Sequence, residues 1–244
     1  MNVMKHVSVA VFICAAALAE TAHGQSHVDP DLGARLFSAS YTVTFRGIRA
    51  GELVFTLKKS GTHFVYESIA HPRALARIVV NDNLREASEF AIEQGVIKPL
   101  SYELDDGSKK TDEDTRLTFD WQGQKAVGMH EDQHIEIPLA PGVQDRMSAQ
   151  VEVMRWLQAG REPSAITFID RNELKEYRYV HVRDETIKTA IGDLAATVIE
   201  SSRPGSNRLT RLWYATALEY LPVRGEQVRK GKVETVFEIK ELKQ

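Results

Sequence analysis

Cysteine is almost missing from this sequence. Among 244 residues there is one, Cys14, and it lies inside an apolar run at residues 7–18. If that run is removed during export, the remaining chain has no disulfide, no thiol nucleophile and no thiolate metal site. Its stability must then come from a hydrophobic core, which a chain of this length can supply.

The apolar run has the form of a signal peptide. It follows the polar residues Lys5 and His6, is too short to span a bilayer, and precedes a small–x–small triplet at residues 22–24. We therefore expect a signal peptide at residues 1–24 and a periplasmic protein; a second candidate cleavage triplet lies at residues 17–19. No later segment approaches 18 consecutive apolar residues, so no transmembrane segment is expected after cleavage.

An excess of either charge is also lacking. The formal net charge is −3 and the pI is about 6.3, which gives no reason to expect a nucleic-acid partner. The sequence contains no G-x-S-x-G, no P-loop and no glycine-rich dinucleotide loop. We expect no cofactor and no enzymatic activity.

One motif with catalytic associations is present, HEDQH at residues 130–134. In H-E-x-x-H zinc peptidases the two histidines lie on one helical turn and bind the metal, while the glutamate acts as base. Here the following residues, 134–139, alternate like a strand, on which His130 and His134 would be about 13 Å apart. We predict a hairpin with its turn near Glu131 and Asp132 and no metal site; a zinc hydrolase is the remote alternative.

The feature that is abundant is a period-two alternation of apolar and polar residues, which indicates β-strands. It is clearest at residues 207–242, which predict three strands, the last with Val233, Thr235, Phe237 and Ile239 on one face. After a loose lead-in at residues 25–38, we predict a single mainly β domain at residues 39–244. Other predicted elements are a short helix within residues 71–80 and separate strands at residues 177–182 and 185–190.

One long amphipathic helix interrupts the strands at residues 145–159. Met147, Val151 and Met154 share one side, Asp145 is suited to cap the first turn, and Gly160 ends the helix. A single helix covers only part of a sheet of about ten strands. The rest of the sheet must close on itself or leave an apolar trough.

Five stretches of the sequence carry a family resemblance. They are YTVTFRGIRAGEL at 41–53, KPLSYEL followed by LTFDW up to 121, IPLAPGVQDRMSAQ at 137–150, ETIKTAIGDLAA at 185–196 and RLWYATALEYLPVR at 211–224. In these stretches the chain resembles the exported Gram-negative proteins grouped as domain-of-unknown-function family 3108. It departs from the family pattern at Ala190, where a proline is usual.

The C-terminal strands are also similar to those of the LolA-like lipid carriers. The shared order is Leu212-Trp213, then Leu-Pro-Val-Arg at 221–224, then Gly231 before the final alternating strand. This resemblance implies a large, strongly curved antiparallel sheet, an open or half barrel of LolA or lipocalin type. In such a barrel the concave face holds acyl chains and is partly covered by helices.

We therefore expect a non-enzymatic protein that binds a lipid or another apolar envelope molecule on the concave face of the sheet. The residues expected to line that face are Tyr41, Phe45, Phe55, Phe119, Trp121, Trp213 and Phe237. The alternative is a packed β-barrel that acts as a protein-interaction module in envelope assembly, with envelope proteins as partners. The distinguishing observation is whether the interior is open or filled by side chains.

Overall fold

The computed structural model describes residues 36–73, 83–107 and 114–244, and over these it has fifteen strands and one α-helix. The α-helix is α1 (Arg146–Gln158), and a short 3-10 helix (Thr216–Leu218) joins the thirteenth strand to the fourteenth. The strands are β1 (Phe37–Phe45), β2 (Ile48–Ser60), β3 (His63–Pro72), β4 (Leu84–Glu93), β5 (Val96–Asp105), β6 (Thr115–Asp120), β7 (Lys125–His130), β8 (Gln133–Pro138), β9 (Gln144–Asp145), β10 (Ala165–Asp170), β11 (Glu173–Thr189), β12 (Gly192–Ser202), β13 (Arg208–Ala215), β14 (Leu221–Arg229) and β15 (Lys232–Lys243).

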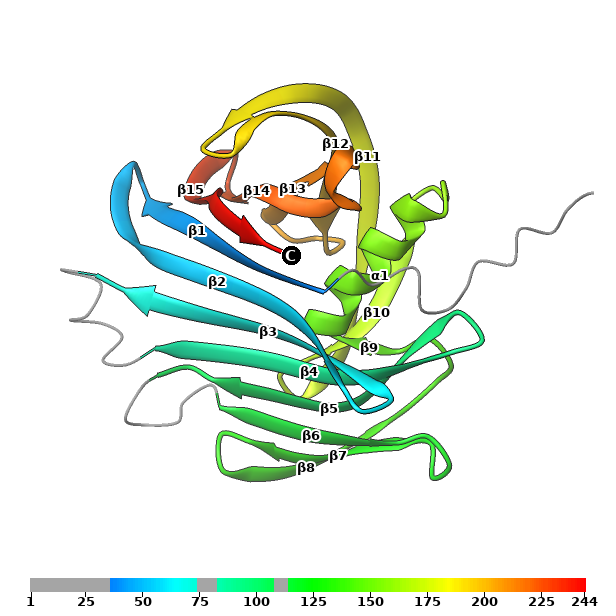
Figure 1. The fold of residues 1–244 in the computed structure, drawn as a ribbon. Helices are drawn as coiled ribbons and strands as arrows, with labels where there is room; N and C mark the ends of the chain where they lie inside the picture. The colour runs from blue at the N-terminus through cyan, green and yellow to red at the C-terminus, as the bar shows by residue number, and fades with distance from the viewer. Residues whose placement is uncertain (1–35, 74–82, 108–113) are drawn as a thin grey trace, which may run out of the picture.

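All the strands belong to one sheet, whose order follows the sequence closely. From β1 the sheet runs through β2 to β8 in one direction and through β15 back to β9 in the other. Neighbouring strands are antiparallel except β9, which pairs parallel with β10. The sheet is strongly curved but does not close, since β8 and β9 are its two edges (Figure 1). The predicted mainly β fold with a curved, open antiparallel sheet is confirmed.

Several of the connections are tight turns with a local chemical cause. Gln94 and Gly95 have φ of 51° and 78°, and Lys230 and Gly231 have φ of 50° and 73°. Positive φ at both central residues is what a type I′ hairpin turn requires, and glycine accepts it without steric cost.

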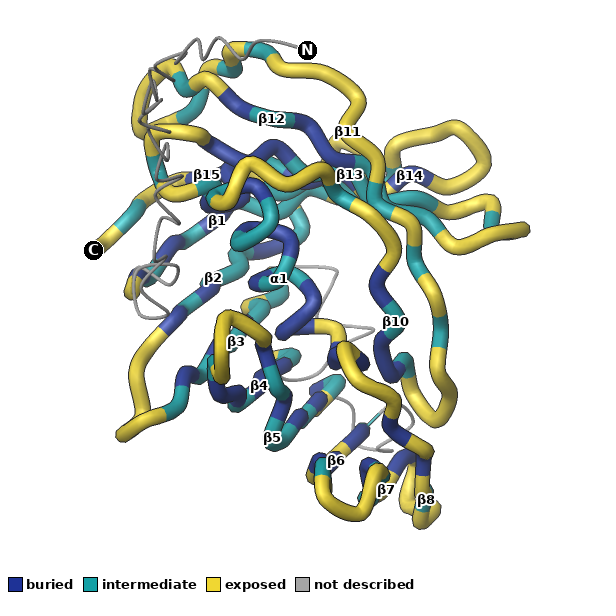
Figure 2. The backbone as a smooth tube through the Cα atoms, turned by 90° about the vertical axis from the view of Figure 1, so that its right-hand side faces the viewer, coloured by how far each residue is buried: buried dark blue, intermediate teal, exposed yellow. Residues whose placement is uncertain are grey.

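The helix α1 lies on the concave side of the sheet, between β3, β4 and β5 on one side and β10 on the other (Figures 1 and 2). It buries Met147, Val151, Val153 and Met154 against the sheet, in agreement with the predicted apolar side. The helix thus supplies the centre of the hydrophobic core. No helix among the described residues combines the length and apolarity needed to cross a bilayer.

The N-terminus of α1 is held by a buried carboxyl group. Asp145 accepts hydrogen bonds from the backbone N–H groups of Met147 and Ser148, both at 2.8 Å, as the predicted N-cap. The Ser88 hydroxyl of β4 also donates to Asp145, at 2.6 Å. One side chain therefore caps the helix and ties it to the sheet.

Some predicted bounds differ from the structure. β1 begins at Phe37, which is buried, so the domain starts earlier than residue 39. The two strands predicted at 177–182 and 185–190 are one long strand, β11, because a bulge between His181 and Arg183 absorbs the break in the pattern. The predicted signal peptide lies outside the described residues, as do residues 74–82, where most of the predicted short helix falls.

Candidate functional site

Three of the seven residues expected to line an apolar site meet on the concave face. The ring of Tyr41 packs edge-on against Phe55 and Phe237, with centroid distances of 5.6 and 5.5 Å. Tyr41 is fully buried, its hydroxyl donates to the Pro222 carbonyl at 2.7 Å, and burial raises the pKa of its phenol. These three rings pack against one another on the concave face, as side chains do in a hydrophobic core.

Three more of the seven residues lie apart from the cluster of Tyr41, Phe55 and Phe237. Phe119 stacks on Trp121 with ring centroids 6.2 Å apart, at the end of β6, and the Trp121 indole donates to the Pro99 carbonyl at 2.7 Å. Phe45 is 45% exposed, because the sheet extends beyond the helix that covers it. The period-two pattern predicts which face of the sheet Phe45 is on, but it does not predict how much of that face α1 covers.

Trp213 was expected on the concave face, and this expectation is wrong. Successive residues of a strand point to opposite faces, and it is Leu212 that lies with Phe237 on the concave side, where both would meet a Cβ atom at Gly225. Trp213 is buried on the other face of β13. Both residues are apolar, so alternation alone did not distinguish the two faces.

The surroundings of Trp213 are ionic. The guanidinium groups of Arg183, Arg211 and Arg224 lie 5.9, 5.9 and 5.2 Å from its ring centre. Its indole N–H donates to Glu185 at 2.6 Å. The three arginines also form ion pairs with glutamates of the same face. Cation–π contacts and ion pairs thus stabilise the outer face of the sheet around Trp213.

The HEDQH segment forms the hairpin that the sequence predicts. β7 and β8 pair through it, and both turn residues, Glu131 and Asp132, have positive φ. His130 is buried and its ring bonds to the Thr115 hydroxyl at 2.9 Å, whereas His134 is exposed and pairs with Met129 on the opposite face. The two histidines do not converge, so the geometry that the zinc motif requires is not formed.

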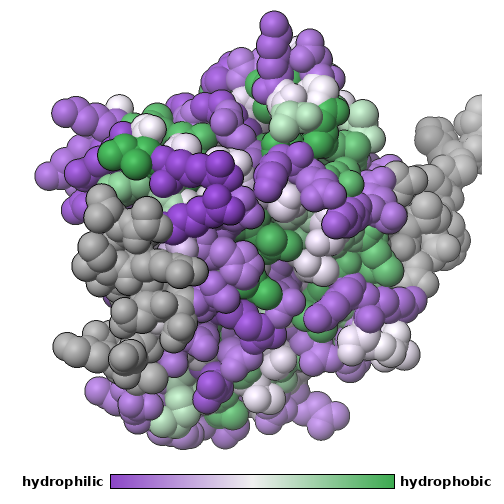
Figure 3. All heavy atoms as spheres, turned by 60° about the vertical axis from the view of Figure 1, so that its left-hand side comes forward, coloured by the Kyte–Doolittle hydropathy of each residue, from purple (hydrophilic) through white to green (hydrophobic). Residues whose placement is uncertain are grey.

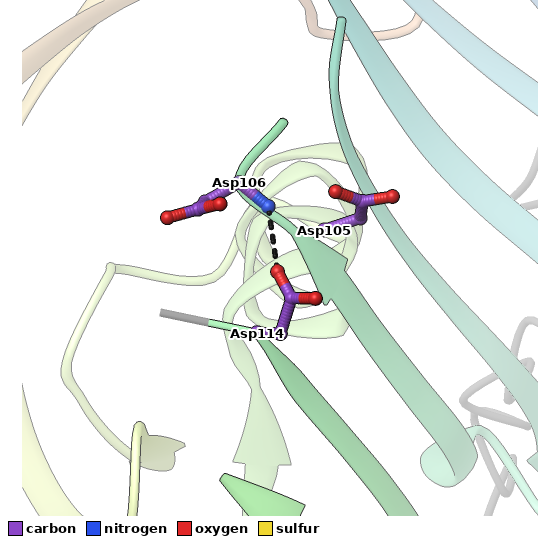
Figure 4. A group of neighbouring side chains, drawn as sticks. All are labelled: Asp105, Asp106 and Asp114. Atoms are coloured by element: carbon purple, nitrogen blue, oxygen red, sulfur yellow. Dashed lines mark hydrogen bonds between the residues drawn. The ribbon is translucent and has the colours of Figure 1, made fainter. Parts of the chain in front are cut away.

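A group of three carboxylates lies where β5 ends and the chain enters β6 (Figure 4). Asp105, Asp106 and Asp114 have carboxylate oxygens within 4.8 Å of one another. Asp114 accepts a hydrogen bond from the backbone N–H of Asp106 at 3.1 Å, and Asp105 accepts one from Gly107 at 2.9 Å. Two of the three carboxylates therefore hold backbone N–H groups just after β5, which is a structural role.

A hollow of about 300 Å³ lies beside α1, where the chain crosses from β8 to β9. It is partly open to solvent; most of its lining residues are apolar, but about half of the surface that they expose is polar. The lining residues are Val96, Ala140, Pro141, Gly142, Val143, Gln144, Glu152, Trp156, Ala165, Ile166, Thr167 and Leu174. We call this hollow the α1 cleft.

A buried amide marks the α1 cleft. Gln144 is 3% exposed, and its Nε2 donates to the Ile97 carbonyl of β5 at 3.1 Å. That bond fixes the orientation of the amide, because the flipped form would place two oxygens together. The Oε1 atom is buried and has no hydrogen-bond partner among the described residues. Buried acceptors without donors are uncommon and costly, so this atom is suited to accept a hydrogen bond from a bound molecule.

An aromatic side chain, Trp156, contributes to the lining of the α1 cleft. Its ring meets Tyr179 edge-on at 6.4 Å, and the Arg161 guanidinium lies 5.9 Å from the ring centre. Arg161 also pairs with Glu152 at 3.6 Å. The cleft therefore combines apolar lining residues with one buried acceptor and the carboxylate of Glu152, which Arg161 pairs from outside the lining.

Sequence reasoning did not find this site. For residues 137–150 the sequence predicted a family resemblance and the helix cap, but no ligand site. The available signal was Gln144 itself, a polar side chain that follows Val143 and precedes the N-cap. Its burial depends on Ile97, a residue far away in the sequence.

One solved structure shares the fold at low sequence identity, and two others match with lower TM-scores. A β-barrel-like protein of domain of unknown function DUF1849 from Brucella abortus matches with a TM-score of 0.50 and 9% identity, covering 85% of this chain and 96% of that one. A candidate lipoprotein from Parabacteroides distasonis matches with a TM-score of 0.39 and 12% identity, over 86% and 96% of the two chains. A candidate exported protein with a YmcC-like fold from Bacteroides fragilis has a TM-score of 0.33 and 11% identity, over 85% and 95%.

The comparison with curated proteins finds no match. A family model, by contrast, matches residues 40–237, which includes most of the strands and all of α1. This chain therefore belongs to the family described as "Protein of unknown function (DUF3108)".

Proposed function

We propose that this chain is a non-enzymatic periplasmic binding protein whose ligand is a small, mainly apolar molecule carrying a hydrogen-bond donor. The observation that carries the proposal is Gln144, which lines the α1 cleft and whose buried Oε1 has no hydrogen-bond partner among the described residues. A donor such as a hydroxyl or an amide N–H would complete the hydrogen bonding of that oxygen. The apolar lining would bury the rest of the ligand.

The size of the cleft restricts the ligand. About 300 Å³ is at the lower end of ligand sites, which suits a single short chain rather than a whole phospholipid. The concave face is a poorer candidate, because Tyr41, Phe55 and the buried side of α1 already occupy it.

The test uses two probes that differ only in the donor, 1-decanol and its methyl ether. Calorimetric titration of the purified protein is expected to show that the alcohol binds at least about tenfold more tightly than the ether, since the ether leaves Gln144 without a donor.

Ala165→Trp places a large ring in the cleft from an exposed position and should abolish binding. The matched control, Ala190→Trp, changes an exposed alanine in the β11–β12 turn and should leave binding intact. Equal affinity for the two probes, or binding that survives Ala165→Trp, would contradict the proposal.

A second candidate function, protein interaction, is favoured by the free edge of β11. β10 pairs with β11 only as far as Arg178, and the Tyr179 N–H donates to the Ser164 carbonyl. Beyond that point one edge of β11 has no strand partner among the described residues. Val180 and Val182 are 57% and 43% exposed there. An edge of this kind can accept an extended segment of another protein as an added strand.

This candidate is tested by a photoreactive amino acid at Val180. If an envelope protein pairs with β11, irradiation of cells should give one discrete adduct. The same amino acid at the exposed Thr118 of β6 should give none. Identical patterns at the two positions, or no adduct at Val180, would reject the interaction.

A further inference from the structure

Two hairpin tips lie side by side at one end of the sheet. The β1–β2 tip and the β14–β15 tip are joined because β1 pairs with β15, with Phe45 opposite Thr235. The Arg46 N–H donates to the Glu234 carbonyl at 2.7 Å, just beyond the strand pairs. The two tips therefore form one continuous surface.

Large apolar side chains are exposed on this surface. Phe45, Ile48 and Val233 are 45%, 73% and 44% exposed. Phe45 lies opposite both Ile48 and Thr235, so Phe45 and Ile48 point to the same face. A bulge at Glu234 turns Val233 to the other face of its own tip, so the period-two pattern expected from Val233 to Ile239 is interrupted there. The side of the molecule shown in Figure 3 is mostly hydrophilic with separate hydrophobic patches, which is the usual background for exposed apolar residues. Three large ones gathered on neighbouring tips are unusual against it.

Basic side chains surround the same tips. An open hollow of about 300 Å³ is lined by Arg46, Arg229, Lys230, Lys232 and Glu234, four cations and one carboxylate. Arg208 adds a cation opposite Arg229.

One carboxylate does not neutralise these cations. Glu234 pairs with Arg46 at 2.8 Å. The hydrogen bond from Arg46 and the nearby cations lower the pKa of the Glu234 carboxyl. Arg229, Lys230 and Lys232 form no ion pair with any residue that the structure describes. The tips are thus strongly basic on a chain whose net charge is −3.

We propose that this basic, apolar end docks on the surface of an anionic membrane. Phe45, Ile48 and Val233 would enter the interface between headgroups and acyl chains, and the cations would face lipid phosphates. Exposed apolar groups flanked by lysine and arginine are the combination that binds anionic bilayers. An acidic protein would satisfy the cations but gives no role to three apolar groups projecting at the tips of two hairpins. The inference does not depend on the α1 cleft.

The test is flotation of the purified protein with vesicles of phosphatidylcholine, with and without phosphatidylglycerol. Binding is expected only to the anionic vesicles, and to weaken when salt is raised to about 0.5 M. Lys230→Gln with Lys232→Gln should reduce binding by about ten- to thirtyfold, because each cation near the surface adds to the attraction. The matched control, Lys188→Gln with Lys243→Gln, also removes two exposed lysines, but at the end of the sheet away from the two tips. This variant should bind as the unchanged protein does.

Ile48→Ser separates the membrane from other anionic partners. It should weaken vesicle binding severalfold and leave binding to soluble polyglutamate unchanged. The proposal is overturned if the protein does not bind anionic vesicles, if the control variant is as impaired as the Lys230→Gln, Lys232→Gln variant, or if Ile48→Ser has no effect on vesicle binding. The last result would make the surface a site for soluble polyanions instead.

Discussion

At the scale of single residues, Asp145 combines a structural role with an unusual electrostatic position. It is fully buried, accepts hydrogen bonds from two backbone N–H groups and from Ser88, and begins α1. Burial raises the pKa of its carboxyl to about 6, although the hydrogen bonds act in the opposite direction. The capped helix therefore depends on a group that titrates within the range of ordinary buffers.

The sign of the resulting pH dependence follows from the raised pKa. The folded carboxyl holds its proton more tightly than the unfolded one, whose pKa is near 3.8. Its contribution to stability is fully present below about pH 4 and is lost as the pH rises through about 6. The free energy of unfolding should lose up to about 3 kcal/mol over that interval from this group.

Asp145→Asn should remove that slope. Asparagine can still accept from the backbone N–H groups and does not titrate, so the variant's free energy of unfolding should be flatter between pH 4 and 7. Urea denaturation at several pH values measures this. Asp193→Asn, an exposed control, should keep the slope of the unchanged protein. Parallel curves for the Asp145 variant and the unchanged protein would show that Asp145 is not responsible.

Single residues also show what sequence reasoning can and cannot reach. The N-cap Asp145 and the glycine that follows the end of α1, Gly160, were predicted because capping depends on neighbours in the chain. The turn at Glu131 and Asp132 was predicted for the same reason. The positions of Trp213 and Gln144 depend on partners far away in the sequence, which alternation does not specify.

At the scale of elements, the contact between β6 and β7 depends on a glycine. Gly128 of β7 lies opposite Leu117, and a Cβ atom there would overlap the carbonyl oxygen of Arg116. The overlap is with backbone, which cannot move aside without disturbing the strand pair.

Gly128→Ala should therefore destabilise the protein by about 1–3 kcal/mol, the usual cost of forcing extra atoms into a packed site. Urea denaturation gives the free energy of unfolding. Thr118→Ala on the facing strand changes an exposed side chain and should stay within about 0.5 kcal/mol of the unchanged protein. A neutral Gly128→Ala would mean that β6 and β7 separate easily.

Elements were predicted better than the connections between them. The helix was expected at residues 145–159 and runs over Arg146–Gln158, because its caps and apolar side are local signals. β11 was expected as two strands, because a bulge adds one residue and reverses the alternation. The openness of the curved sheet was anticipated, but the occupation of its concave face by α1 could not be derived from one helix's pattern.

At the scale of the whole molecule, the sheet is unevenly supported. β3, β4 and β5, which contact α1, are paired on both edges, whereas β11 beyond Tyr179 is paired on one edge and exposed along most of its length (Figure 2). Local opening is cheapest where backbone hydrogen bonds face solvent and few apolar contacts hold them.

Hydrogen exchange measured by mass spectrometry should follow this difference. Peptides covering residues 180–189 are expected to exchange much faster than peptides covering β1 or β4. Exchange of residues 180–189 that is as slow as that of β4 would contradict the free edge. It would indicate that another chain covers β11 in solution.

The pairing of β1 with β15 also has a consequence for how the chain is made. Ser38 lies opposite Lys243, so a strand synthesised early completes its hydrogen bonds only with the last strand to appear. Until then β1 has one unpaired edge, a template for mispairing with other chains. The complete sheet can therefore form only after β15 has been synthesised. Any factor that shields β1 during this interval would act on yield rather than on the stability of the finished protein.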